Sequence, residues 1–140
     1  MTDPFNLRRF VEAQDPIYFR VLTELRSGVK QSHWMWFVFP QVAGLGRSPT
    51  AEFYAIHSLD EAKAYLAHPL LCGRLKECTH ALLDVTGKSA RQILGTPDDL
   101  KFRSSMTLFA HAAPEELVFH EALAKYFDGE EDAMTASLLR

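Results

Sequence analysis

Two polar side chains, His33 and Gln41, border the most apolar stretch of the chain, the run from Trp34 to Pro40. Apolar walls with a few well-placed polar groups are typical of ligand pockets, and tryptophans beside a histidine suit a stacked nucleobase or a nicotinamide-like ring. The same pattern fits an ordinary core, in which these rings are only buried. The pocket interpretation makes His33, Trp34, Trp36 and Gln41 candidate ligand contacts, and the core interpretation stays open beside it.

The segment of residues 44–50 has the composition of an anion-binding loop. Its two glycines allow the backbone to approach a ligand, Arg47 carries a guanidinium, and Ser48 precedes a helix start whose first amides are free to bind an anion. The segment is neither a P-loop nor a dinucleotide-binding fingerprint, because it lacks the Lys-Ser/Thr pair of the first and the third glycine of the second. We expect either an anion or phosphate site at Arg47 and Ser48 or a plain loop before a capped helix.

A third polar cluster, Asp98, Lys101, Ser104 and Ser105, lies in a stretch with helical periodicity. On a helix, Lys101, Ser104 and Ser105 share one face, and Asp98 lies one turn before Lys101. Serine is a poor residue for a helix interior, so two in succession indicate close helix packing, contact with a ligand or, together with Lys101, a nucleophile pair. If the protein is an enzyme, Asp98 or His33 is the candidate acid or base.

Several classes of function find no support in the sequence. The six histidines form no HExxH motif, and Cys72 and Cys78 complete no zinc pattern, so we expect no metal and no cofactor. A net charge of −3 argues against a nucleic-acid binder, which needs a basic surface. The longest apolar run is far short of the ~20 residues of a membrane span, and the N-terminus lacks a signal-peptide pattern. We expect a cytoplasmic protein that does not enter a membrane.

The elements that must position these residues are helices. Cap residues before proline, glycines at helix ends and apolar residues at intervals of three and four predict nine helical ranges. The ranges are 4–13, 16–27, 49–57, 59–67, 69–84, 89–94, 97–112, 115–127 and 131–138. Residues 33–39 fit a buried helix or a short buried strand equally, and Pro40 ends either one. The sequence therefore predicts one all-α domain over residues 1–140, with about seven to nine short helices.

Several of these stretches resemble the bacterial domain-of-unknown-function family 1810. The likeness runs nearly end to end and is carried by residues 3–7, 10–14, 33–41, 44–46, 58–62, 65–69 and 101–109. The tryptophan-rich run and the run from Lys101 to Phe109 are its most specific parts. The resemblance implies a compact all-α fold and no particular activity. Family members often carry the label calpastatin, but nothing in this chain supports protease inhibition.

A more distant likeness is to the NADAR (YbiA-like) proteins, which are linked to cleaving N-glycosidic bonds in ADP-ribose derivatives and riboflavin-pathway intermediates. It depends on the order of His68-Pro69, a leucine-rich helix, Gly87 and Pro97-Asp98. The tryptophan of their Phe-Trp-Gly motif is missing, and Lys101-Phe102-Arg103 stands in its place. The likeness implies an N-glycosidase-like hydrolase, although a fold-level analogy transfers no function by itself.

Two hypotheses follow from these features. In the first, the protein binds, or hydrolyses, a small anionic ligand that carries a ring, such as a nucleotide or an ADP-ribose derivative. In the second, it is a non-catalytic interaction or structural module whose aromatic run is only core. The first hypothesis is favoured if five side chains converge on one open cleft: His33, Gln41, Arg47, Lys101 and Ser105. The sequence does not define an oligomeric state.

Overall fold

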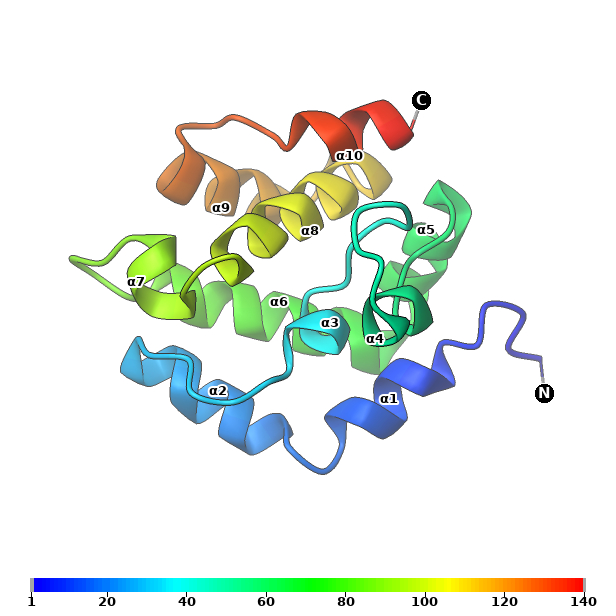
Figure 1. Cartoon of the computed structure of the whole chain (residues 1–140), viewed down its shortest axis with the longest axis horizontal. Helices are drawn as coiled ribbons and strands as arrows, with labels where there is room; N and C mark the ends of the chain where they lie inside the picture. Colours follow the sequence, from blue (N-terminus) through cyan, green and yellow to red (C-terminus); the bar gives the residue numbers. More distant parts are fainter. Residues whose placement is uncertain (1, 140) are drawn as a thin grey trace.

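The computed structural model describes residues 2–139, which form ten helices and, apart from one isolated bridge, no strand (Figure 1). The helices are α1 Arg8–Gln14, α2 Tyr18–Ser27, α3 Met35–Val38, α4 Pro49–Phe53, α5 Leu59–Ala67, α6 Pro69–Leu83, α7 Ala90–Leu94, α8 Asp98–Ala112, α9 Leu117–Phe127 and α10 Ala133–Leu138. The prediction of an all-α fold is confirmed, with slightly more helices than expected. The additional helix is α3, a single turn inside the aromatic run whose structure the sequence left undecided.

Local capping by a side-chain oxygen determines where four of the helices begin, and the ring nitrogen of His68 caps α6 in the same way. Before α4, α5, α7 and α10, a side-chain oxygen accepts a hydrogen bond from the backbone N–H three residues later. Such a cap satisfies one of the amides that a helix start leaves free. The four capping residues are Ser48, Ser58, Ser89 and Asp132. Each stands at or next to a predicted helix start.

The first helix begins later than predicted, at Arg8 instead of Pro4. The Asp3 carboxylate accepts hydrogen bonds from the N–H groups of Leu7 at 2.8 Å and Arg8 at 3.0 Å, so it caps this later start. Asn6 between them has a φ of 52°, a left-handed conformation that interrupts a helix. The residues between Asp3 and Arg8 therefore form turns.

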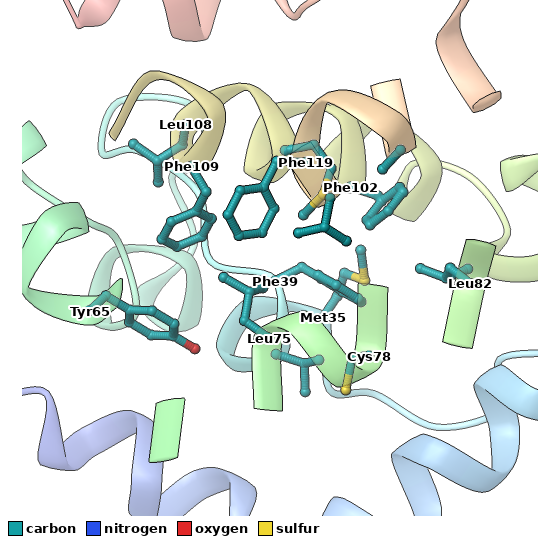
Figure 2. Close-up of a cluster of buried hydrophobic side chains, with 14 of the residues drawn as sticks. Met35, Phe39, Tyr65, Leu75, Cys78, Leu82, Phe102, Leu108, Phe109 and Phe119 are labelled. Atoms are coloured by element: carbon teal, nitrogen blue, oxygen red, sulfur yellow. The ribbon is translucent and has the colours of Figure 1, made fainter. Parts of the chain in front are cut away.

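The core lies around the two longest helices, α6 and α8. Helix α6 packs against α2, α5 and α9, and α8 packs against α5, α7, α9 and α10. Figure 2 shows Phe102 and Phe109 of α8 facing Leu75 of α6, with Phe39 between them. The rings of Phe39 and Phe102 pack edge to face, with centroids 4.9 Å apart and planes at 77°. This contact brings the aromatic run and the start of α8 together.

Most of the aromatic run is core. Trp34, Met35, Val38 and Phe39 are all nearly or fully buried. Trp36 is only half-buried, which leaves one tryptophan ring at the surface. The core interpretation therefore holds for Trp34, and Trp36 alone of the two tryptophans is accessible to a ligand.

Glu24 of α2 fixes the start of this run. Its carboxylate accepts hydrogen bonds from the backbone N–H of Gln31 at 2.8 Å, the backbone N–H and hydroxyl of Ser32, and the indole N–H of Trp34 at 2.9 Å. Burial by itself raises the pKa of Glu24, but the hydrogen bonds from Ser32, Gln31 and Trp34 outweigh burial and lower that pKa from its ordinary value to about 2. The charged carboxylate is therefore the form that holds the run in place.

A buried ion pair fixes the segment after α4. Arg9 Nε donates to the carbonyl of Phe53 at 2.8 Å, and Arg9 Nη2 donates to the carbonyl of Ala55 at 2.9 Å and to the carboxylate of Glu61 at 2.8 Å. Glu61 also accepts the backbone N–H of His57 at 3.0 Å. Through these bonds α1 and α5 together position residues 53–57.

Candidate binding groove

An open groove of about 440 Å³ separates the loop before α4 from the start of α8. Its walls come from residues 41–51, residues 97–104 and the start of α10. We call it the α4/α8 groove. The lining residues are Gln41, Leu45, Gly46, Arg47, Ser48, Ala51, Pro97, Leu100, Lys101, Ser104, Asp132 and Met134.

The loop that forms one wall is held by backbone hydrogen bonds to Ile56. The N–H of Ile56 donates to the Gln41 carbonyl at 2.9 Å, and the N–H of Ala43 donates to the Ile56 carbonyl at 2.8 Å. These bonds form the isolated parallel bridge of the fold. Because the Arg9–Glu61 pair fixes the segment that contains Ile56, the loop takes its position from α1 and α5.

Charges and rings connect the other wall to the aromatic run. The Asp98 carboxylate lies 3.0 Å from Lys30 Nζ and 3.6 Å from Lys101 Nζ. Lys30 Nζ is 5.0 Å from the ring centroid of Trp34, and Lys101 Nζ is 4.9 Å from that of Trp36. A cation over a tryptophan face is favourable. The contacts with Asp98 and Trp36 therefore hold the Lys101 ammonium at the edge of the groove.

The groove combines cationic groups with apolar surface. Arg47 is exposed, and within residues 2–139 its side chain has no hydrogen-bond or ion-pair partner. Leu100 and Met134 are 53% and 60% exposed and supply the apolar part. The Asp132 carboxylate also lines the groove, but it accepts hydrogen bonds from the N–H and hydroxyl of Thr135 at 3.0 and 2.6 Å. The arrangement suits a ligand with an anionic group and an apolar body.

The structure brings half of the sequence-predicted site residues to this groove: Gln41, Arg47, Ser48, Lys101 and Ser104. The Ser104 hydroxyl donates to the Leu100 carbonyl at 3.1 Å, so its oxygen can still accept. Trp36 lies next to the groove, in a smaller pocket of about 60 Å³. The two hollows share Gln41, Gly46 and Ala51.

The other four predicted residues line neither hollow. His33 is exposed outside them, and Trp34 is fully buried against Glu24. Ser105 is 0% exposed, and its hydroxyl has no partner within residues 2–139, so here the serine pair reflects close helix packing. Asp98 lies between two lysines. Of the five residues whose convergence would favour the ligand hypothesis, Gln41, Arg47 and Lys101 meet in the groove and His33 and Ser105 do not.

Sequence reasoning missed the apolar and acidic parts of the groove. Leu45 lies within the predicted 44–50 segment, and Leu100 directly precedes Lys101. Their position in the sequence could therefore have identified them as candidates. Asp132 and Met134 come from the far end of the chain, and no local pattern connects them to Arg47. Only the packing of α10 against α8 brings them to the site.

Residues 2–139 contain neither a cluster of metal-binding side chains nor a membrane-spanning helix. No three His, Cys, Asp or Glu side chains there lie close enough together to hold a metal ion. Likewise, none of the described helices has both the length and the apolar character needed to cross a membrane.

A family model described as a protein of unknown function (DUF1810) matches residues 4–139. The chain belongs to this family. It is also similar to a solved structure, the conserved hypothetical protein Rv1873 from Mycobacterium tuberculosis, with 57% sequence identity over 98% of each chain and a TM-score of 0.97. A search of the curated proteins found no match. Membership of the DUF1810 family confirms the resemblance seen in the sequence.

Proposed function

We propose that the α4/α8 groove binds a small anionic ligand that carries a ring, such as a nucleotide or an ADP-ribose derivative. The observation that supports this is the meeting of Gln41, Arg47 and Lys101, from distant parts of the sequence, in one open groove. Arginine and lysine are the side chains that pair with phosphate and carboxylate groups. A volume of about 440 Å³ is within the range of small-molecule sites.

The apolar body of the ligand would lie against Leu100 and Met134. Both side chains are more than half exposed, so covering them with a ring removes apolar surface from water. Lys101 stands on the same helix as Leu100, one residue further on, and Arg47 faces it from the loop. A ligand in the groove would therefore have its anion between two cations and its ring on the apolar surface.

The proposal is for binding, without hydrolysis. General acid or base catalysis needs a titratable side chain within hydrogen-bond reach of the reacting group. Asp98 is paired with Lys30 and Lys101, and His33 lies outside the groove. Asp132 lines the groove, but its carboxylate caps α10. No candidate from the sequence analysis is thus free and in place to act on a glycosidic bond.

Isothermal titration calorimetry with AMP, ADP and ADP-ribose tests the proposal. Arg47→Ala should raise the Kd at least about tenfold, because it removes a charge-assisted contact, and should leave the Tm of the free protein unchanged. Arg91→Ala, an exposed arginine on α7, is the matched control and should bind as the wild type does. Equal binding by Arg47→Ala would contradict the groove as the binding site. No binding of any of the three ligands would contradict the proposal and favour the interaction-module hypothesis.

A further inference from the structure

The smaller pocket beside the α4/α8 groove gathers polar side chains that the fold does not use. Its wall includes Trp36, Gln41, Glu52, Tyr54 and His57. Within residues 2–139, none of these five side chains makes a hydrogen bond or an ion pair with another residue. Trp36, Gln41 and Tyr54 are half-buried, and Glu52 and His57 are exposed, so their polar atoms are open to water or to a ligand.

The size of the pocket limits what it can hold. Its volume of about 60 Å³ has room for a few water molecules or a small polar group, and it is much smaller than the groove. Because the two hollows share Gln41, Gly46 and Ala51, a ligand in the groove could extend one small substituent into the pocket.

The two ends of the combined space differ in charge. The groove carries the cations Arg47 and Lys101, whereas the pocket carries the carboxylate of Glu52. An ionised carboxylate accepts hydrogen bonds and cannot donate them. The Trp36 indole N–H only donates, and Gln41, Tyr54 and His57 can donate or accept. Glu52 is thus the one side chain of the five that only accepts, and a group that donates hydrogen bonds is its best match.

We propose that the pocket and the α4/α8 groove form one elongated site, in which the pocket takes a small hydrogen-bond donor, such as an exocyclic amine, at the end of the ligand opposite its anion. This inference rests on the proposed function of the groove, because the anion at Arg47 and Lys101 sets the orientation of the ligand. A substituent that only accepts hydrogen bonds would leave Glu52 unpaired, and an anionic one would be repelled by it.

A matched pair of probes tests the inference. AMP and purine riboside 5′-monophosphate share phosphate, sugar and ring, and the second lacks the exocyclic amine. In calorimetric titrations the wild type should bind AMP at least about tenfold more tightly, as expected for a hydrogen bond to a charged group. Glu52→Gln keeps the size of the side chain and removes its charge, so it should reduce this preference and leave the affinity for the second probe unchanged. Glu121→Gln, an exposed glutamate of α9, is the control and should change neither affinity.

The outcomes separate this inference from the proposed function. If the wild type binds both probes equally and Arg47→Ala weakens both, the groove binds anions and the inference about the pocket is overturned. If Glu52→Gln keeps the full preference for AMP, the amine is recognised elsewhere and the inference also fails. If neither probe binds, the proposed function fails and the inference fails with it.

Discussion

Arg9 and Glu61 are single residues on which the geometry of the groove depends. Their side chains are 7% and 4% exposed, and all five N–H groups of the Arg9 guanidinium donate hydrogen bonds. In a buried pair of this kind, loss of one partner leaves the other as an unpaired charge out of water. Sequence patterns do not predict this pair, because Arg9 and Glu61 are far apart in the chain and each looks like an ordinary surface residue.

Arg9→Met should therefore lower the free energy of unfolding by about 3 kcal/mol or more. Urea denaturation followed by circular dichroism measures this loss. The neighbouring pair of Arg8 and Glu12 has side chains that are 78% and 63% exposed, so Arg8→Met should change the free energy of unfolding by less than about 1 kcal/mol. Similar losses in the two variants would show that the buried pair does not stabilise the fold.

Glu24 makes the stability of the fold depend on pH in the acid range. Its pKa is about 2 in the folded protein and near its ordinary value, about 4.3, in the unfolded chain. A carboxyl whose pKa is lower in the folded protein than in the unfolded chain stabilises the fold fully at a pH above the pKa of the unfolded chain. This stabilisation is lost as the pH falls through the pKa of the folded protein.

Glu24→Gln should accordingly be less stable than the wild type at pH 7, by on the order of 2 kcal/mol. The difference between the two proteins should shrink as the pH falls from about 4.3 towards 2. Urea denaturation of both proteins at a series of pH values tests this. A difference that stays constant over that range would mean that the ionised carboxylate does not hold the aromatic run.

At the scale of elements, the approach of the 41–48 loop to α4 depends on Gly46. A Cβ atom at Gly46 would lie 2.7 Å from the Cβ of Ala51, so Gly46→Ala must push the loop away from the helix. We expect it to lower the free energy of unfolding by about 1–2 kcal/mol and to weaken AMP binding. Since Ala51→Gly removes the obstacle, Gly46→Ala should cost less in that background, which a double-mutant cycle measures.

Gly73→Ala is the matched control for this effect. Gly73 lies within α6, and nothing lies within 4 Å of a Cβ atom placed there. Alanine is the better helix residue, so this variant should gain about 0.5–1 kcal/mol and bind AMP as the wild type does. A loss at Gly73 as large as that at Gly46 would remove the steric explanation.

The helices themselves were largely predictable, because caps and apolar spacing are local signals. Ser48 and Ser58 cap helices at the predicted starts. The start of α1 was wrong, because Asp3 caps the turn at Leu7 and Arg8 instead of the turn after Pro4. A cap residue followed by proline indicates a start but does not decide which of two successive turns becomes helix.

At the scale of the whole molecule, the charges that line the groove matter more for ligand binding than the net charge of the chain. The chain carries a net charge of −3, yet Arg47 and Lys101 face one groove. Their placement follows from the packing of α8 against the aromatic run and from the bridge that holds the 41–48 loop. Sequence could name Arg47 and Lys101 as candidates. It could not show that they meet, nor that Ser105 on the same helix points into the core.

The central claim is that the α4/α8 groove is a binding site, and an NMR titration of the ¹⁵N-labelled protein with AMP tests it most directly. We predict saturable shifts of the amide signals of residues 41–48, 98–104 and 132–134, which line or adjoin the groove, while the signals of α2 stay in place. The same titration of Arg47→Ala should give much weaker shifts. Shifts that cluster at another surface, or no shifts at all, would contradict the account.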